Sequence, residues 1–486
     1  MKYYNPYAAE IRIRDDHALP TIRIHKLVIE HFKSVEYGEV EFACAKRFVP
    51  YGTQSDILGM YGQNGSGKSA FIEALDIIRL AMRGARIPAA YAEAIQAGAD
   101  HARLAATFDL QYENGNVRRV IYSCCLRKVE NRDETDMDAS HEVSGVTDRQ
   151  KPPYRVQIFD EDVSASGVFE DRKIKLQTII TTACADAVFG PASKRSSYIG
   201  KNKKLFMQLE GLKVIAERRS TSFLFSGAVL DAFAKNSDYS EFCQILLELN
   251  LYATRYLAVV GTKASGLIRL NVSMPFVNRS GQILVPTDKG MVIPQELLGG
   301  MRRRMQGISD VLGQIVPGAQ FRLKVLSKTI TENGKPGYVI ELVSVRNGTE
   351  LPIRAESDGI RRLISVLELL IEVMNEPSVT VVIDEFDAGI YEYLLGEILE
   401  AIQDYGKGQF IFTSHNLRPL EVLDKNFICF TTTNPQNRYC RMTHIGNTNN
   451  LRDIYYREIL LGEQDEEVYS MTKRHRIVQA MKKAGE

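Results

Sequence analysis

The segment GQNGSGKS at residues 62–69 has the residue types and spacing of a loop that binds phosphate groups. Its glycines allow a tight turn in which backbone N–H groups point at an anion. The apolar residues at 57–61 predict a buried strand before the loop, and the apolar positions at 71–78 recur at helical spacing after it. A loop that opens a helix holds phosphates at the positive end of the helix dipole. A chance match is the alternative, but the flanking elements favour a nucleotide-binding site.

Two side chains of this loop have a predicted role beyond that of the backbone. Lys68 would reach the β- and γ-phosphates, and the Ser69 hydroxyl would bind Mg²⁺. The chain has no Asn-Lys-x-Asp motif for reading guanine, so ATP is the predicted nucleotide and Mg²⁺ the predicted metal. The predicted nucleotide contacts in the loop are Gly62, Gln63, Asn64, Gly65, Ser66, Gly67, Lys68 and Ser69.

A second group of candidate residues follows two apolar runs in the last third of the chain. Residues 379–383 predict a buried strand that ends at Asp384 and Glu385, and residues 409–413 predict another that ends just before His415. Parallel strands carry ligands at their carboxyl ends. We predict that Asp384 binds Mg²⁺ and that Glu385 is the catalytic base that orients the attacking water. His415 is predicted to be catalytic as a γ-phosphate sensor. An ordinary strand-end Asp-Glu pair and an incidental His are the alternatives.

The stretch ESDGIRRL predicts the start of an amphipathic helix that precedes the Asp384 strand. Ser357 and Gly359 stand at its N-terminus, where free backbone N–H groups can bind an anion. Both residues are therefore predicted nucleotide contacts. The alternative is a helix that Ser357 simply caps.

The order of these motifs resembles the ABC-type ATPase head of the RecF/SMC and OLD-like families, and LVIEHFKS at 27–34 resembles their first strand. The resemblance implies an α/β fold, in which a mixed sheet is flanked by helices and carries an antiparallel β subdomain and a helical insertion. It also implies a homodimer or higher oligomer with shared ATP sites. Ser357 and Gly359 of one copy would contact the γ-phosphate held by Lys68 of the other, with Asp387 at the interface.

The chain departs from the family pattern in two places. Asp358 replaces a glycine of the family's Leu-Ser-Gly-Gly-Gln signature, whereas Ser357 and Gly359 match it. The glutamine that joins Mg²⁺ in the family has no clear equivalent, and Gln111 and Gln157 are the candidates.

What the ATPase is for follows from a further resemblance. The insertion is too short and aperiodic for an SMC arm, and the residues after His415 leave no room for the Toprim nuclease domain of OLD nucleases. The chain thus resembles stand-alone ATPase components of bacterial anti-phage systems, such as those of the PARIS and Septu types. The implied partner is a separate effector, a nuclease or toxin, with DNA or a phage protein as trigger. The alternatives are a RecF-like DNA-repair ATPase that clamps DNA, and a structural module that binds nucleotide without hydrolysing it.

Composition and patterning set the wider expectations for the 486 residues. The formal net charge of +1 gives no global signal for a polyanion, although Arg302, Arg303 and Arg304 form a local basic cluster. Seven scattered cysteines indicate a reducing compartment, and no apolar segment predicts a signal or a membrane span, so we expect a cytoplasmic protein. The predicted divisions are an N-terminal arm at 1–20, a first ATPase lobe at 21–202, a helical insertion at 203–318, a second ATPase lobe at 319–462 and a charged C-terminal helix at 463–486. We expect a turn near Gly38, and effector contacts in the insertion or the C-terminal helix.

Overall fold

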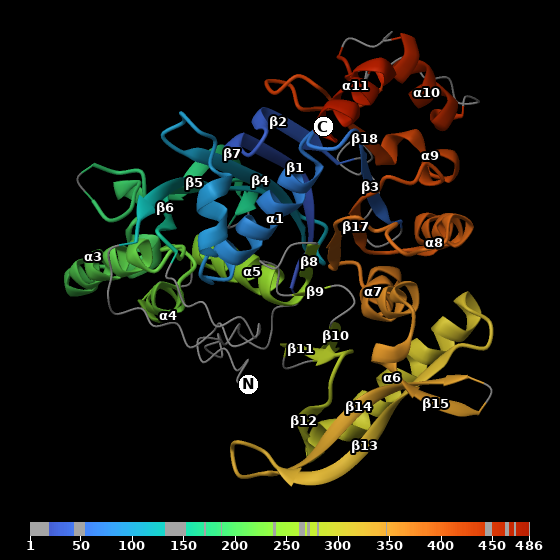
Figure 1. Ribbon diagram of the computed structural model, residues 1–486. Helices are drawn as coiled ribbons and strands as arrows, with labels where there is room; N and C mark the ends of the chain where they lie inside the picture. The colour runs from blue at the N-terminus through green and yellow to red at the C-terminus, as the bar shows by residue number, and fades with distance from the viewer. Residues whose placement is uncertain are drawn as a thin grey trace.

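The computed structural model of the chain describes most of its length (Figure 1). Residues 1–18 of the predicted N-terminal arm lie outside the described residues. The described residues are 19–42, 54–131, 152–169, 172–185, 187–236, 240–261, 268–269, 273–278, 281–346, 348–442, 450–461, 466–470 and 473–485.

A seven-stranded sheet in the order β19-β18-β3-β17-β16-β8-β9 positions all the candidate motifs. Its strands run parallel except β19, so most of their carboxyl ends meet at one edge. Every residue of β3, β16 and β17 is buried, as continuous apolar runs predict for strands covered on both faces. The strands are β3 (Asp56–Tyr61), β8 (Leu257–Gly261), β9 (Ile268–Arg269), β16 (Thr380–Ile383), β17 (Gln409–Thr413), β18 (Ile428–Thr431) and β19 (Tyr439–Cys440).

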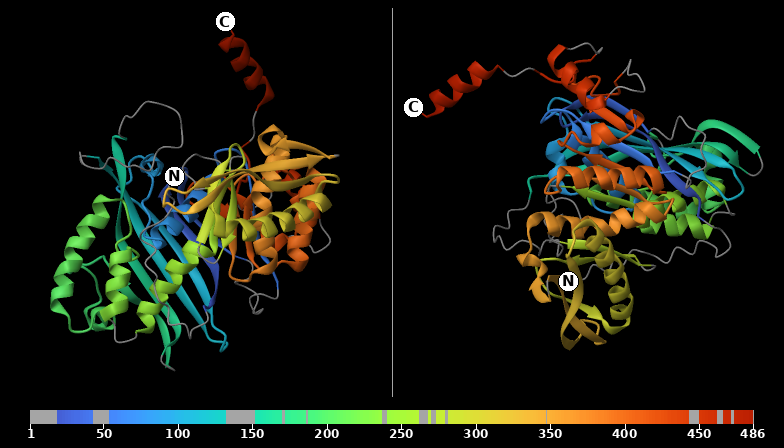
Figure 2. Two further views of the ribbon diagram at one scale, coloured as in Figure 1. Left: turned by 90° about the horizontal axis from the view of Figure 1, so that it is seen from below. Right: turned by 90° about the vertical axis from the view of Figure 1, so that its right-hand side faces the viewer.

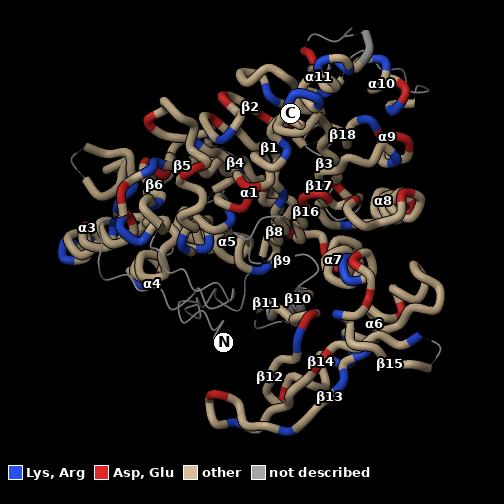
Figure 3. The backbone as a smooth tube through the Cα atoms, in the orientation of Figure 1, with Lys and Arg blue, Asp and Glu red and all other residues tan. Residues whose placement is uncertain are grey.

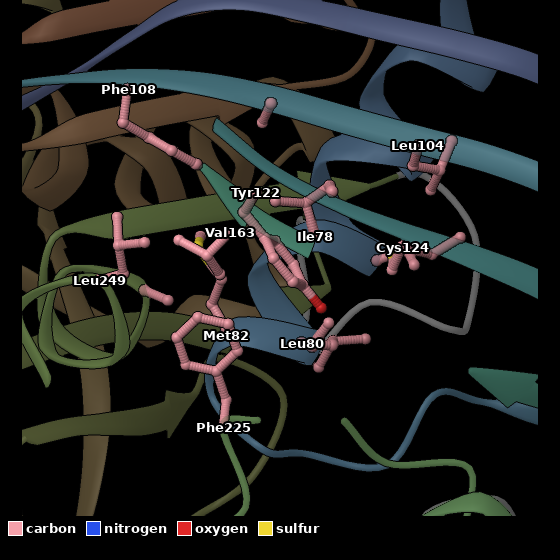
Figure 4. Packing of buried hydrophobic residues seen from close by; sticks show 14 of the residues in the cluster. Ile78, Leu80, Met82, Leu104, Phe108, Tyr122, Cys124, Val163, Phe225 and Leu249 are labelled. Atoms are coloured by element: carbon pink, nitrogen blue, oxygen red, sulfur yellow. The ribbon is translucent and has the colours of Figure 1, made fainter. Parts of the chain in front are cut away.

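A second sheet is antiparallel throughout and has the order β2-β1-β4-β5-β6-β7. Helix α1 (Lys68–Met82) packs against β1 and β4 of this sheet and against β8 of the central sheet, and it is buried along nearly its whole length. Figure 4 shows Ile78, Leu80 and Met82 of α1 among apolar side chains of this sheet and the neighbouring helices. The strands are β1 (Thr21–Phe32), β2 (Val35–Glu41), β4 (Ala102–Gln111), β5 (Val117–Glu130), β6 (Tyr154–Phe169) and β7 (Arg172–Thr181).

The prediction of a single helical insertion over 203–318 is wrong in part. Three helices do open it, but β8 then joins the central sheet beside β16, and four further strands, β9 to β12, precede α6. The apolar run at 257–260 is only a few residues long, and periodicity cannot separate such a run from a buried helix. The elements are α3 (Lys203–Arg218), α4 (Gly227–Asn236), α5 (Glu241–Arg255), β10 (Ser273–Asn278), β11 (Gly281–Pro286), β12 (Met291–Pro294) and α6 (Gln295–Ile315).

The rest of the chain forms a small lobe and the helices beside the central sheet. Helix α6 packs on the antiparallel strands β12, β13 and β14, with β15 at the edge, in the lower right of Figure 1. Within the described residues no helix is both long enough and apolar enough to cross a membrane. The remaining elements are β13 (Gln320–Ile330), β14 (Pro336–Arg346), β15 (Thr349–Pro352), α7 (Asp358–Asn375), α8 (Glu392–Tyr405), α9 (Pro419–Val422), α10 (Leu451–Leu461) and α11 (Arg474–Ala484).

The turn predicted near Gly38 is wrong, because β1 and β2 are joined at residues 33–34 and Gly38 lies inside β2. A Cβ on Gly38 would lie 2.6 Å from the ring of Tyr439. A glycine within a strand often marks such a close approach by another group. The Tyr439 hydroxyl in turn donates a hydrogen bond to the carbonyl of Gly67 (2.9 Å), so Gly38 makes room for a support of the candidate phosphate loop.

We expect the buried carboxyl group of Glu248 on α5 to make stability depend on pH. It accepts hydrogen bonds from Tyr112 Oη (2.8 Å) and Gln244 Nε2 (2.9 Å), but burial outweighs them and raises the pKa of Glu248 to about 7. The folded chain therefore binds this proton more tightly than the unfolded chain. The stabilisation is greatest below the ordinary pKa of a glutamate and is lost as pH rises through about 7.

The measurement is the free energy of unfolding from denaturant titrations at pH 5 and pH 8. Between these values the native chain should lose on the order of 2 kcal/mol relative to Glu248→Gln, because the glutamine side chain mimics the protonated carboxyl group. Glu210→Gln, at an exposed position on α3, is the control and should follow the native chain. Equal losses in native chain and Glu248→Gln would contradict the expectation.

Candidate functional site

Residues 62–67 connect β3 to α1 as a glycine-dependent loop. Gly62, Gly65 and Gly67 have φ angles of 148°, 79° and 102°, a region of backbone conformation that favours glycine. A Cβ on Gly62 would also lie 1.8 Å from the hydroxyl oxygen of Thr431, so space as well as conformation requires glycine there. The three glycines bring the loop back over the N-terminus of α1, which is the geometry of a phosphate cradle.

Lys68, the first residue of α1, points back over this loop. Its Nζ donates to the carbonyls of Gly62 (2.7 Å) and Gln63 (3.0 Å). Burial lowers the pKa of Lys68, and the carboxylates of Asp384, Glu385 and Asp387 act in the opposite direction. The structure therefore brings the predicted phosphate-binding lysine and the predicted acids together at one edge of the central sheet.

The loop is also held by the end of β18 and by a C-terminal segment. The hydroxyls of Ser66 and Thr431 are hydrogen-bonded to each other, and Ser66 Oγ also donates to the carbonyl of Gln63 (2.6 Å). The side chain of Gln63 accepts a hydrogen bond from the backbone N–H of Ser470 (2.9 Å), within the C-terminal segment at 466–470. Segments far apart in sequence thus fix the shape of the loop.

Asp384 and Glu385 follow β16 and are oriented by one hydroxyl group. Thr413 Oγ1, at the end of the neighbouring strand β17, donates to Asp384 Oδ1 (2.6 Å) and accepts from the backbone N–H of Glu385 (2.7 Å). Asp384 is buried, and the Glu385 side chain is exposed. Thr413 was not among the predicted site residues, although a hydroxyl residue at the end of a predicted parallel strand is a signal for such a role.

Glu385 has a φ of 50°, in the left-handed region that non-glycine residues rarely adopt. Such a conformation costs about 1–3 kcal/mol and persists only where its surroundings hold it. Arg362 of α7 supplies part of that hold, because its guanidinium donates to the carbonyls of Glu385 and Asp384 (3.3 Å to Asp384). Burial lowers the pKa of Arg362, against the opposing effect of Asp387, Glu385 and Asp384. Arg362 was not a predicted site residue either, and its signal in the sequence is an arginine at a buried position of an amphipathic helix.

His415 lies in the turn after β17, with its side chain exposed. Asp387 Oδ2 accepts the backbone N–H groups of His415 (3.1 Å) and Asn416 (2.9 Å). The Oδ1 atom of Asp387 is buried and has no hydrogen-bond partner among the described residues. Asp387 therefore supports the His415 turn within its own chain, and its place at a dimer interface stays a prediction.

Ser357 caps α7 and is exposed, with its Oγ accepting from the N–H of Ile360 at 3.4 Å. The capped-helix alternative is thus present in the geometry, and the exposed helix start still leaves a surface for an anion. Gly359 has a separate packing role, because a Cβ there would lie 2.4 Å from the carbonyl oxygen of Gly389. The start of α7 therefore packs directly on the loop that follows Glu385.

We expect Gly359→Ala to destabilise the fold by about 1–3 kcal/mol, because overpacking forces the backbones of α7 and the following loop apart. ATP hydrolysis should fall with it, since α7 carries Arg362. The matched control is Gly307→Ala in α6, where nothing lies within 4 Å of an added Cβ and the change should stabilise by up to about 1 kcal/mol. Denaturant unfolding of both variants is the measurement, and equal effects would contradict the contact.

The two candidate glutamines lie on the antiparallel sheet. Gln157 of β6 accepts from Arg127 Nε (3.0 Å) and donates to Glu217 (2.8 Å), so both ends of its amide are engaged there. Gln111 is the last residue of β4 and pairs with Thr21 in the ladder. Neither arrangement supports a role at Mg²⁺.

The residues present fit a Mg²⁺ ion that shares its ligands with a nucleotide. Ser69 at the start of α1 and Asp384 offer a hydroxyl and a carboxylate, and Mg²⁺ takes such oxygens together with phosphate oxygens and water. In the part of the chain that the structure describes, no three His, Cys, Asp or Glu side chains are grouped to hold a metal by themselves. The metal is therefore expected together with ATP.

Residues 301–421 match the family model described as "AAA domain, putative AbiEii toxin, Type IV TA system". The match runs from α6 to α9 and includes Asp384, Glu385 and His415, but not the loop at 62–69. A search of curated proteins found no match.

Among solved structures, the chain is similar to SMC head domains. An SMC head bound to the C-terminal winged-helix domain of ScpA has 14% identity and a TM-score of 0.37, covering 87% of this chain and 98% of that one. The SMC head of Thermotoga maritima has 13% identity and a TM-score of 0.34, covering 86% and 99%. The SMC head of Pyrococcus yayanosii, with its coiled coil and joint, has 13% identity and a TM-score of 0.37, covering 90% and 99%.

The fold is a mixed α/β fold in which a strand, a glycine-dependent loop and a helix are arranged as in P-loop nucleotide-binding proteins. Its mixed central sheet carries the loop of residues 62–69 and the acids at neighbouring strand ends, and an antiparallel sheet covers α1. The matched model of an AAA domain agrees with a nucleotide-binding site in this arrangement.

Proposed function

We propose that this chain binds and hydrolyses ATP with Mg²⁺ at sites shared between copies, as a cytoplasmic homodimer or higher oligomer that controls a separate effector in bacterial anti-phage defence. The observation that carries the ATPase part is the convergence of Lys68 with Asp384 and Glu385 at the carboxyl edge of the central sheet. The exposed Ser357 and Glu385 side chains support a site that a second copy completes.

The proposed mechanism assigns one task to each group. The loop amides and Lys68 bind the phosphates, while Ser69 and Asp384 hold Mg²⁺, which offsets the charge that develops on the phosphate oxygens. Glu385 orients the attacking water and accepts its proton. Ser357 and Gly359 of the second copy close the site, and His415 contacts the γ-phosphate. ATP then favours the associated state because it makes contacts that exist only there.

The defence setting of the proposal is supported by the family description, which names a putative AbiEii toxin of a type IV toxin–antitoxin system. The resemblance to stand-alone ATPases of the PARIS and Septu types agrees with it. A DNA-clamping role has less support from the basic cluster, because the charge of Arg304 is paired with Glu368 (2.9 Å) and Glu372. Of the three arginines, Arg302 and Arg303 are exposed.

The test is a pull-down of tagged Glu385→Gln protein from its native host, with the captured proteins identified by mass spectrometry. Slow hydrolysis should hold the ATP-bound assembly together, so a nuclease or toxin captured in stoichiometric amount supports the proposal. The control is the double variant Glu385→Gln, Lys68→Ala, which should lose the partner together with ATP. Capture of repair proteins and DNA without an effector would favour the RecF-like alternative.

A further inference from the structure

Helix α11 is amphipathic and has no packing partner in the described chain. It buries none of its residues, and it projects from the body in both views of Figure 2. Ile477, Val478 and Met481 lie on one face at helical spacing and are 43%, 44% and 71% exposed. Residues 473–483 carry five Lys or Arg residues and no Asp or Glu. An exposed apolar face on a basic helix is typical of a docking surface.

The outer face of α8 has the complementary character. Its 14 residues include four acids and no Lys or Arg. Tyr393, Glu397, Glu400 and Asp404 recur along the side opposite the buried leucines, and Tyr393 is 59% exposed. The exposed tyrosines Tyr391 (76%) and Tyr405 (74%) stand at the two ends of the helix. The face is therefore acidic and partly aromatic, and Figure 3 shows the charges of both helices along the backbone.

Each of the two helices directly follows a segment that lies at the proposed shared ATP site. The segment before α11 is held beside the phosphate loop, because Ser470 N–H bonds to Gln63, Val468 is buried, and the carbonyl of Glu467 accepts from Thr433 N–H (2.7 Å). Helix α8 begins directly after the loop that contains Asp387 and contacts Gly359 at the start of α7. In the proposed dimer, the segment before α11 accompanies the phosphate loop of one copy, and α8 follows the loop that packs on the start of α7 in the other.

We propose that α11 of one copy packs its apolar face on the acidic, tyrosine-bearing face of α8 in a second copy. The inference rests on the shared ATP site proposed above and adds a second contact to that interface. The lengths agree, since 11 and 14 helical residues span about 16 and 21 Å. The charges are opposite, which steers association and fixes the register of the pair.

Charge reversal at exposed positions tests the pairing on the full-length chain. Arg474 and Lys482 flank the apolar face of α11 at helical spacing, and Glu397 and Asp404 lie on the outer stripe of α8. One variant carries Arg474→Glu with Lys482→Glu, and the other carries Glu397→Lys with Asp404→Lys. Both are made in the Glu385→Gln background, and self-association with ATP is measured by sedimentation velocity. Lys203→Glu with Lys204→Glu, at exposed positions of α3, is the matched control.

Each reversed variant alone should self-associate about ten-fold more weakly, because like charges then face each other. A mixture of the two variants should regain the original affinity, since both pairs of faces are complementary in the mixed dimer. The control should associate like the parent. Recovery of affinity in the mixture indicates a contact between copies. If α11 instead packed on α8 of its own chain, the two helices of each variant would carry like charges and mixing would not restore the contact.

Three outcomes would overturn the proposal. Unchanged association of both variants would show that α11 lies elsewhere. Recovery only when all four changes are in one chain would place α11 on its own α8. Loss of binding to vesicles of anionic lipid on reversal of α11, with association unchanged, would assign the helix to a membrane surface. If the Glu385→Gln parent binds ATP and stays monomeric, the shared-site function fails as well. If the parent associates with ATP but the charge reversals do not change that association, the contact between α11 and α8 is wrong and the shared ATP site is not contradicted.

Discussion

Glu385→Gln is expected to lower the rate of ATP hydrolysis by about 100-fold or more while leaving ATP binding intact. A positioned general base contributes about 10²–10⁴ in rate, and glutamine keeps the size and polarity of the side chain but cannot take a proton. The backbone should stay in place because it is held from outside the side chain, by Thr413 Oγ1 at the N–H and by Arg362 at the carbonyl. The variant thus separates chemistry from folding.

Steady-state phosphate release measures the rate, and fluorescence of a labelled ATP analogue measures the affinity. Glu210→Gln on α3 makes the same chemical change at an exposed position and should hydrolyse ATP at the native rate. Because slow hydrolysis keeps ATP in place, the variant should also remain associated with ATP for longer than the native chain. A rate within a few-fold of native would show that Glu385 is not the catalytic base. Another acid near the phosphate loop would then have to take that role.

Lys68→Ala is expected to weaken ATP binding by about 100-fold or more, and hydrolysis should become undetectable. Charge-assisted hydrogen bonds to phosphate are among the strongest polar contacts, and Lys68 is the one cation that the loop itself supplies. Its Nζ bonds now to the carbonyls of Gly62 and Gln63, so it is already oriented along the loop. Removing it also takes away one of the two positive charges, with Arg362, that lie near the carboxylates of Asp384 and Glu385, which disfavours a bound triphosphate further.

Equilibrium binding of labelled ATP, with and without Mg²⁺, is the measurement. Lys235→Ala on α4, an exposed lysine remote from the loop in sequence, is the control for loss of one positive charge. Unfolding temperatures of both variants should be close to native, which separates lost contact from lost structure. ATP affinity that survives in Lys68→Ala would contradict a phosphate-binding role for the loop.

Much of the candidate site could be predicted because its signals are local. The loop at 62–69 encodes its own shape, since three glycines supply the backbone angles that the turn needs. The apolar runs before Asp384 and His415 predict strands buried on both faces, and β16 and β17 are buried in that way. The amphipathic pattern after Ser357 predicts α7 to within a few residues. In each case neighbours in sequence determine the conformation.

The sequence by itself determined these elements and the residues at their ends, but only the tertiary structure decided what holds them. Thr413 orients Asp384 from 29 residues away, Tyr439 supports Gly67 from 372 residues away, and Gly38 is required by the Tyr439 ring rather than by a turn. The pairing of β8 with β16 and the full exposure of α11 likewise follow from the tertiary structure and not from local sequence. The physical reason is that periodicity records whether a side chain is buried, whereas its hydrogen-bond partner depends on how distant segments pack.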